Sequence, residues 1–154
     1  MITIIQYEEK YQPDFKRLNL EWLDKYNLTE QYDLDILDYP QQNVIDPGGC
    51  IFLAMEDDKV VGTAGLAKEK EGVYELVKMA VDPLSRGKGI GKILLERCLQ
   101  EAVKLQAKKV SLFSNSKLVT ALSMYKKYGF RHIPVTDSHL LTADVKMELV
   151  LAIV

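Results

Sequence analysis

The sequence has few of the residues that mark several common protein classes. Its 154 residues include two cysteines, Cys50 and Cys98, which are too few and too far apart for a disulfide framework or a cysteine-rich zinc site. No apolar run approaches the roughly 18 residues that a membrane span needs. The first residues lack the basic region and the cleavage site of a signal peptide. We therefore expect a cytoplasmic protein with no membrane partner.

The chain also lacks a strong net charge. Its 20 Lys and Arg residues nearly balance its 22 Asp and Glu residues, for a net charge of −2, and bulk charge therefore excludes a polybasic nucleic-acid binder. The average hides an uneven distribution, because residues 1–66 carry 5 basic and 13 acidic residues, whereas residues 67–154 carry 15 and 9. The two halves have net charges of −8 and +6, so we expect them to face different partners.

The length and the 47% hydrophobic content fit one domain, residues 1–154, with a real core. Apolar periodicity and turn residues predict the order β-α-α-β-β-β-α-β-α-β-β. The predicted strands cover residues 2–7, 50–56, 59–68, 73–81, 109–114, 130–134 and 145–154, and the predicted helices cover residues 12–26, 29–38, 89–106 and 117–128. Consecutive strands should pair antiparallel, and the strand–helix–strand unit of residues 73–114 should be parallel and right-handed. Cys98 lies on the apolar face of its helix and should be buried.

A glycine-rich turn between a predicted strand and a predicted helix is the most informative segment. It reads Arg86-Gly-Lys-Gly-Ile-Gly-Lys92. A helix start leaves backbone N–H groups unpaired, small residues let an anion approach them, and the helix dipole adds positive charge. The lysines and the arginine add more. The turn therefore predicts a phosphate or pyrophosphate site.

Three phosphate-binding motifs compete for this turn. Walker A fails, because Arg86 stands where its first glycine is needed and Ile93 replaces its Ser or Thr. The dinucleotide fingerprint G-x-G-x-x-G fails, because Lys92 stands at its third glycine. The pattern [Q/R]-x-x-G-x-[G/A] fits residues 86–91. This pattern is the acetyl-CoA pyrophosphate motif of the Gcn5-related N-acetyltransferases (GNAT).

The likeness to that family extends over nearly the whole chain. Three blocks carry it: Tyr74–Leu95 with the turn, Leu112–Phe130 with its Y-x-K-x-G-F ending, and Ala143–Val150. The sequence resembles the small bacterial single-domain branch of the GNAT family. The resemblance implies an α/β (α+β) fold, with a mixed, mostly antiparallel central sheet whose parallel central strands splay apart, flanked by helices.

The resemblance also implies acetyl-CoA as co-substrate and a set of residues that hold it. The strand of residues 73–81 should carry a β-bulge near its end, which frees backbone N–H groups to bind pantetheine and to polarise the thioester carbonyl. The implied cofactor-binding residues are Met79, Ala80, Val81, Arg86, Gly87, Lys88, Gly89, Ile90, Gly91, Lys92 and Asn115. Asn115 could also act as a helix N-cap. No metal site is indicated.

Two residues are predicted to be catalytic. Glu75 is a carboxylate inside an apolar strand, where burial would raise its pKa, and it has the spacing of the family's base glutamate, six residues before Val81. A structural glutamate paired with a lysine is the alternative. The resemblance implies that Tyr125 is the general acid near the CoA sulfur, with a core tyrosine or the neighbouring Tyr128 as alternatives. No partner pattern supports His132 or His139 as catalysts.

The expected reaction is acetyl transfer to a primary amine of a small molecule or peptide, by direct attack in a ternary complex. A cationic acceptor is expected from nine acidic residues of the N-terminal half, with Trp22, Tyr26 and Tyr32 as aromatic walls. The nine are Glu8, Glu9, Asp14, Glu21, Asp24, Glu30, Asp33, Asp35 and Asp38. A non-catalytic acyl-CoA-binding domain and a transferase for a longer acyl group are the alternatives, and a homodimer is left open.

Overall fold

The chain folds around one seven-stranded mixed sheet with the strand order β1-β2-β3-β4-β5-β7-β6. The structure is a computed structural model, and it describes residues 1–136 and 140–151. The strands are β1 (Ile2–Gln6), β2 (Cys50–Glu56), β3 (Lys59–Lys70), β4 (Val73–Val81), β5 (Lys109–Ser114), β6 (Arg131–Ile133) and β7 (Val145–Val150). The helices are α1 (Gln12–Lys25), α2 (Gln31–Asp38), α3 (Ile90–Lys104) and α4 (Val119–Lys127), with the short turns η1 (Glu9–Tyr11), η2 (Gln41–Ile45) and η3 (Pro83–Ser85).

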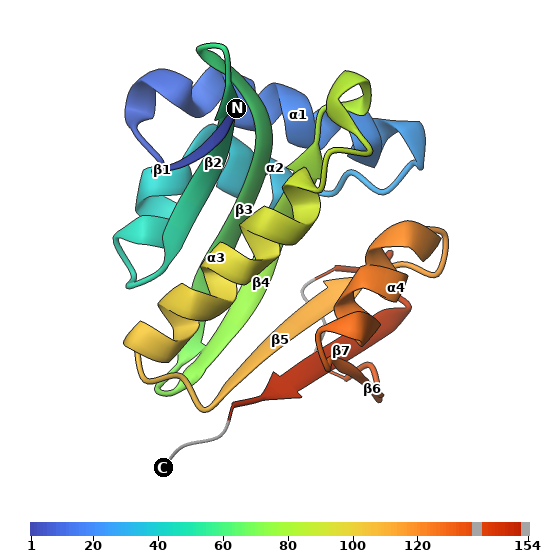
Figure 1. The fold of residues 1–154 in the computed structure, drawn as a ribbon. Helices are drawn as coiled ribbons and strands as arrows, with labels where there is room; N and C mark the ends of the chain where they lie inside the picture. Colours follow the sequence, from blue (N-terminus) through green and yellow to red (C-terminus); the bar gives the residue numbers. More distant parts are fainter. Residues whose placement is uncertain (137–139, 152–154) are drawn as a thin grey trace.

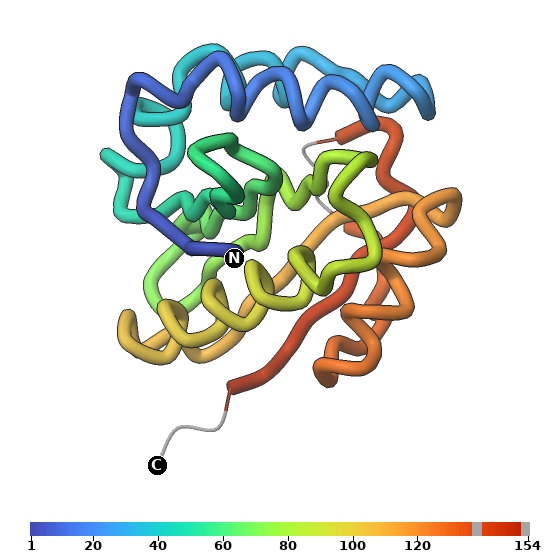
Figure 2. Tube along the Cα trace, turned by 45° about the horizontal axis from the view of Figure 1, so that its top comes forward, coloured from blue at the N-terminus to red at the C-terminus, as the bar shows by residue number. Residues whose placement is uncertain are grey.

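Helices cover both faces of the sheet (Figures 1 and 2). α1 and α2 pack on one face, and α3 and α4 lie on the other. Each face has its own hydrophobic cluster: one contains Phe15, Leu37 and Leu53, and the other contains Leu66, Leu94 and Cys98. Cys98 is fully buried, as its place on the apolar helix face predicts. Burial of both faces explains the long apolar runs in the central strands.

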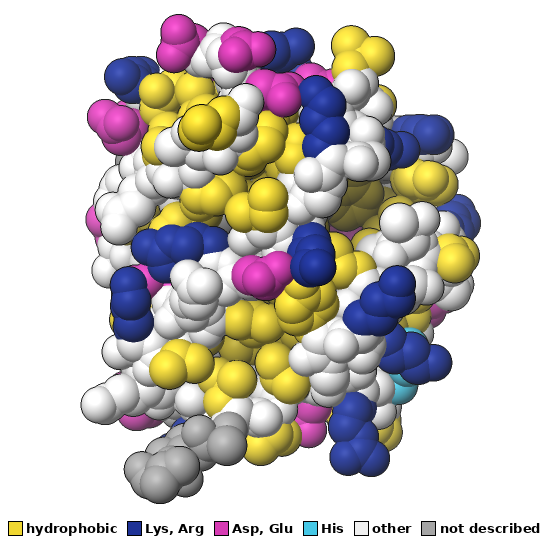
Figure 3. Space-filling view, viewed as in Figure 1, with side chains coloured by type: hydrophobic (Ala, Val, Ile, Leu, Met, Phe, Trp, Pro, Cys, Tyr) yellow, Lys and Arg dark blue, Asp and Glu magenta, His cyan; other side chains and the backbone are white. Residues whose placement is uncertain are grey.

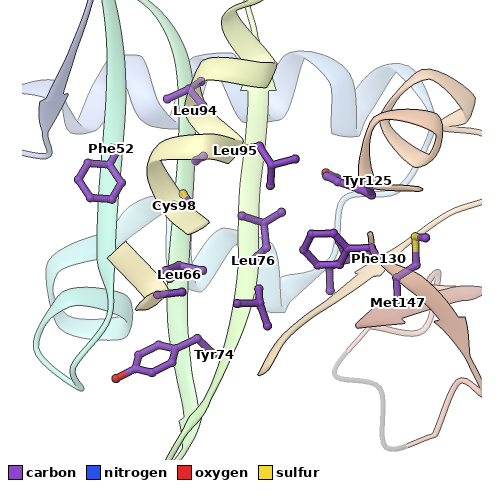
Figure 4. Close-up of a cluster of buried hydrophobic side chains, with 14 of the residues drawn as sticks. Phe52, Leu66, Tyr74, Leu76, Leu94, Leu95, Cys98, Tyr125, Phe130 and Met147 are labelled. Atoms are coloured by element: carbon purple, nitrogen blue, oxygen red, sulfur yellow. The ribbon is translucent and has the colours of Figure 1, made fainter. Parts of the chain in front are cut away.

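The strands β4 and β5 are the only parallel pair among the described residues, and they separate after a short contact. Their register contains three residue pairs, from Val73 opposite Lys109 to Glu75 opposite Ser111. From Leu76 onward β4 pairs with β3 alone. Figure 4 shows buried side chains on the two sides of this divergence, with Leu76 and Leu95 on one side and Tyr125 on the other. The divergence opens the sheet at its centre.

A β-bulge interrupts β4 close to its end. Thr63 of β3 lies opposite Ala80, whereas Gly65 lies opposite Val77, so two residues of β4 face one residue of β3. The first of these, Lys78, has a φ of +54°, which is left-handed and uncommon for a residue with a side chain. The Thr63 hydroxyl donates a 2.7 Å hydrogen bond to the Lys78 carbonyl, which holds this conformation. The bulge predicted near the end of the strand is therefore present.

The predicted element order is confirmed, and the differences lie at element ends. β2, β4 and β5 have the predicted bounds. α3 begins at Ile90, one residue later than predicted, because Gly89 has a left-handed φ of +75°. The helix predicted from Lys117 begins at Val119. The predicted last strand ends at Val150, and residues 152–154 lie outside the described part of the chain.

Candidate active site

A cavity of about 590 Å³ opens where β4 and β5 separate. Residues of α1, α2, β4, the first turn of α3, β5 and α4 line it. Figure 3 shows a hollow with hydrophobic side chains on its floor and Lys and Arg side chains near its edge. The volume falls in the range of ordinary ligand pockets.

The glycine-rich turn forms one end of the cavity and is shaped for a bulky anion. Gly87 and Gly89 have φ values of +83° and +75°, and no atom lies within 4 Å of the point where a side chain would start at either. Gly89 is the N-cap of α3 and has no side chain with which to bond the first N–H groups of the helix. Backbone donors and the helix dipole therefore face an open space of the kind a pyrophosphate fills.

The positive side chains of this turn do not all face the cavity. Arg86 and Lys92 line it, whereas Lys88 does not, because its ammonium contacts both carboxylate oxygens of Glu56 at 3.0 Å. Ile90 lines the cavity, but its side chain is 1% exposed and belongs to the core. Ten of the eleven predicted cofactor-binding residues therefore meet at the cavity, and Lys88 does not.

The free edge of β4 forms the middle of the cavity. Met79, Ala80 and Val81 line it, and they lie beyond the last residue pair that β4 makes with β5. The bulge at Lys78 re-aims the backbone just before them. Backbone N–H groups on a strand edge without a neighbouring strand can donate to a substrate carbonyl. This edge of β4 therefore lies open to the cavity, next to the open turn.

Glu75 lies where the parallel strands separate. Its side chain lines the cavity and is 5% exposed. Burial is the main cause that raises its pKa from 4.5 to about 7, and Glu69 adds to the rise, while Lys78 and Lys146 oppose it. A carboxyl group with this pKa can accept a proton near neutral pH.

Tyr125 lines the opposite wall of the cavity. Its ring packs against Phe130 with the two ring centres 5.8 Å apart, and its hydroxyl points from α4 toward the α3 and β4 side (Figure 4). Burial raises its pKa well above the usual range, so the hydroxyl keeps its proton at neutral pH. Tyr128 does not line the cavity, because its hydroxyl donates to Glu96 at 2.8 Å. Of the two tyrosines, the geometry favours Tyr125.

A family model described as the acetyltransferase (GNAT) family matches residues 8–130. The chain belongs to the GNAT family. The fold prediction is confirmed, because a GNAT acetyltransferase structure from Staphylococcus aureus Mu50 matches with a TM-score of 0.90 and 26% identity, over 99% of this chain and 100% of that one. A GNAT member of this kind, with relatives named as N-acetyltransferases, is supported as an acyltransferase enzyme.

Two curated relatives differ in how much of their length this GNAT chain matches. Human N-acetylaspartate synthetase is 37% identical over 108 residues, which are 70% of this chain and 36% of that protein. The uncharacterised N-acetyltransferase YvbK of Bacillus subtilis is 30% identical over 122 residues, 77% of each chain. The chain thus spans about a third of the synthetase. A Salmonella typhimurium structure, YncA with its cofactor acetyl-CoA, shares the fold with a TM-score of 0.79 and 18% identity, over 99% of this chain and 95% of that one.

Asn115 of this GNAT domain lines the cavity but does not cap α4. Its side-chain amide donates to the Thr142 carbonyl at 2.7 Å, and its oxygen accepts from the Lys117 N–H at 3.0 Å. The N-cap of α4 is Leu118, which makes no side-chain capping bond. The helix-cap role considered for Asn115 is therefore wrong. Its bond to Thr142 instead secures the loop that precedes β7.

We call the end of the cavity lined by α1 and α2 the acceptor end, because the sequence predicts the acceptor there. This end is aromatic, and its charges are few. Trp22, Tyr26 and Tyr32 all line it, as predicted. Of the nine acidic residues expected near the acceptor, only Asp33 lines the cavity. Its carboxylate forms a buried ion pair with Lys78. The strong acidity of the N-terminal half therefore lies mostly outside the cavity.

Lys78 is a charged cavity residue that sequence reasoning missed. It is a lysine inside an apolar strand, three residues after Glu75, and this was the available signal. Side chains alternate in a regular strand, so Lys78 would face away from Glu75. The bulge brings both side chains to the same cavity.

The two histidines have no place in the candidate site. His132 lies in β6, is exposed and does not line the cavity, whereas His139 lies outside the described residues. Among the residues that the structure describes, no group of three or more His, Cys, Asp or Glu side chains could hold a metal ion. Within the same residues, no helix is long and apolar enough to cross a membrane.

Proposed function

We propose that this GNAT domain is an acetyl-CoA-dependent N-acetyltransferase that acetylates a primary amine of a small molecule or peptide by direct attack in a ternary complex. One observation carries the proposal. A buried carboxyl group with a pKa of about 7, Glu75, and a protonated tyrosine, Tyr125, line one cavity that also contains the open glycine-rich turn. A base, an acid and an anion cradle are what this reaction requires.

Residues at different places in the cavity would have different roles in binding and catalysis. Gly87, Gly89 and the first N–H groups of α3, with Arg86 and Lys92, would hold the pyrophosphate. When bound, acetyl-CoA supplies the electrophilic thioester carbon and a thiolate leaving group.

Glu75 accepts a proton from the amine, whose nitrogen forms a bond to the acetyl carbon as the carbon–sulfur bond breaks. The N–H groups at Met79–Val81 stabilise the negative charge on the carbonyl oxygen. Tyr125 donates a proton to the sulfur, and exchange with water restores both residues.

Charge and aromatic side chains bear on the class of the acceptor amine. The charge split of the sequence predicts a cationic amine, and the aromatic wall of Trp22, Tyr26 and Tyr32 would suit one. Against this, Asp33 is paired within the cavity. The name of the human relative, N-acetylaspartate synthetase, points to an amino acid in that protein. Amino acids therefore belong in any acceptor panel.

Two alternatives are a non-catalytic acyl-CoA-binding domain and a transferase for longer acyl groups. The first is disfavoured because Glu75 and Tyr125 both line the cavity. A cavity that serves only for binding has no need of a buried, costly carboxyl group. The second depends on the depth of the cavity beyond the thioester.

A thiol-release assay tests the proposal. Acetyl-CoA is supplied with polyamines, aminoglycosides, amino acids and peptides, and free CoA is measured against the acceptor-free rate. We expect acceptor-dependent release that falls about 100-fold in Glu75→Gln. Binding of CoA without turnover on any acceptor would contradict the proposal and favour a binding domain. Faster release from butyryl-CoA than from acetyl-CoA would favour the longer acyl group.

A further inference from the structure

Lys78 places a buried ammonium group in the wall of the acceptor end. Its side chain is 7% exposed and lines the same cavity as Glu75. A lysine is costly to bury in an apolar strand unless it is paired or functional. The left-handed conformation at the bulge adds a further cost. The fold thus tolerates two unfavourable features at Lys78, which lines the candidate site.

The pairing with Asp33 leaves this ammonium group with donors to spare. Within residues 1–136 and 140–151, its one hydrogen-bond acceptor is Asp33 Oδ1. An ammonium group has three N–H donors. The pair alone therefore does not account for its hydrogen-bonding capacity, and an acceptor oxygen in the cavity could bond to it without displacing Asp33.

Asp33 is much less available than Lys78. Its Oδ1 accepts from Lys78, and its Oδ2 accepts from the Glu30 backbone N–H at 2.9 Å as part of the N-terminal capping box of α2. A carboxylate engaged at both oxygens is a weak site for a cationic acceptor. At this wall, the side chain with unused hydrogen-bonding capacity is therefore the donor Lys78 and not the acceptor Asp33.

Trp22 supplies a second donor without a described partner. Its indole Nε1 is buried, and no residue of the described chain accepts a hydrogen bond from it. Trp22 lines the same cavity as Lys78. Buried indole N–H groups usually find a partner, so an unpartnered one beside a cavity indicates a ligand with acceptor oxygens.

We propose that Lys78, assisted by Trp22, binds a carboxylate of the acceptor, so that the acceptor is an amino acid whose amine faces Glu75. This assignment rests on the proposed function and narrows its acceptor to one class. The bulge is what brings the two charged side chains of β4 to one cavity: Glu75 receives the amine, and Lys78 the carboxylate.

Matched acceptors test the assignment in the wild-type protein. L-Aspartate and L-glutamate are compared with their diamides, with the decarboxylated amines ethylamine and propylamine, which lack both carboxylates, and with spermidine, by kcat/KM in the thiol-release assay. We expect the carboxylate-bearing acceptors to exceed the decarboxylated amines by about 10-fold or more, which is the worth of one charge-assisted hydrogen bond. A preference for spermidine or for the decarboxylated amines would overturn the assignment.

Variants then locate the preference. Lys78→Met alone leaves Asp33 buried and unpaired and could fail to fold, so the main variant is Lys78→Met with Asp33→Asn. We expect its KM for L-aspartate to rise about 10- to 100-fold relative to its KM for the decarboxylated amines, with the KM for acetyl-CoA unchanged. Lys78→Arg should keep the preference, Trp22→Phe should weaken it less, and Lys25→Met, an exposed lysine of α1, should leave it intact. Discrimination that survives the double substitution would overturn the role of Lys78.

Failure of the proposed function gives a different result. No thiol release with any acceptor would contradict N-acetyl transfer. Calorimetric titration of L-aspartate into the CoA-bound protein then decides the carboxylate site by itself. Binding that the double substitution abolishes supports the site, and absence of binding overturns it.

Discussion

Glu75 is buried, and its carboxyl group keeps its proton to a higher pH in the folded chain than in the unfolded chain. Burial raises its pKa from 4.5 to about 7, so the folded protein favours the neutral form more than the unfolded chain does. The resulting cost to the folded state is absent below pH 4.5, grows as the pH rises to 7, and is complete above it. A shift of this size corresponds to about 3 kcal/mol.

Glu75→Gln should therefore stabilise the protein at alkaline pH and not at acidic pH. Glutamine keeps the shape of the side chain and cannot ionise. We expect the free energy of unfolding, measured in urea, to rise by up to about 3 kcal/mol at pH 8.5 and to change little at pH 4.5. An equal change at the two pH values would contradict the raised pKa.

Tyr125→Phe should slow turnover without loosening the fold. Phenylalanine keeps the ring contact with Phe130, which lies 5.8 Å away, and loses only the hydroxyl. We expect kcat to fall about 100-fold while the KM for acetyl-CoA changes little, because general acid catalysis acts in the transition state. Tyr128→Phe is the matched control: it loses the bond to Glu96, outside the cavity, and should leave kcat unchanged. Equal kcat losses in both variants would contradict the assignment.

Sequence reasoning reached Glu75 and Tyr125 because each stands out locally. Glu75 is a charge in an apolar strand, and Tyr125 belongs to a recognisable block of residues. Both line the cavity. Lys78 escaped notice because regular alternation assigns it to the opposite face, and the bulge that reverses this depends on contacts with Thr63 in another strand.

The turn between β4 and α3 owes its shape to glycine conformation. Gly89 has a φ of +75°, and the space that a side chain would enter at this position is open. Gly72, in the turn between β3 and β4, has a similar φ of +79° and does not line the cavity. The two positions thus share the backbone cost of an added side chain and differ in their distance from the candidate site.

Gly89→Ala and Gly72→Ala should both lose about 1–2 kcal/mol of stability, since alanine is strained at positive φ. Only Gly89→Ala should raise the KM for acetyl-CoA, by about 10-fold, because its methyl group enters the space open to the pyrophosphate. Thermal unfolding and initial rates measure the two effects. A KM that rises equally in both variants would contradict a phosphate-binding role for this turn.

Element types were predictable because the local patterns are strong, and the predicted order is confirmed. The residues at which elements begin and end were harder to predict. α4 begins at Val119 rather than Lys117, because residues 115 and 116 instead bond to Thr142 and Asp144, 27 and 28 positions further along the chain. Bonds over such separations leave no local pattern. The separation of β4 from β5 after three residue pairs likewise leaves no local pattern in the sequence.

Two parts of the sheet, β1–β4 and β5–β7, border the cavity. Three residue pairs join β4 to β5, and the loop before β7 bonds to segments on both sides of the cavity. In that loop Thr142 donates to Glu30 at the start of α2, and its carbonyl accepts from Asn115. The cavity is thus closed by segments from both ends of the chain. The charge split could not reveal this, since most of the acidic residues lie elsewhere.

Burial raises the pKa of Glu75, and a pH profile tests its role as the base most directly. The measurement is kcat/KM for a fixed amine acceptor between pH 5.5 and 9 in wild type and Glu75→Gln. Below an apparent pKa near 7, the wild type should lose a further tenfold in activity per pH unit, beyond any loss from protonation of the acceptor amine. In Glu75→Gln this limb should vanish and the rate should fall about 100-fold, while any limb due to the acceptor amine remains. A variant that keeps the same acidic limb and a near wild-type rate would contradict the account of Glu75 as the base.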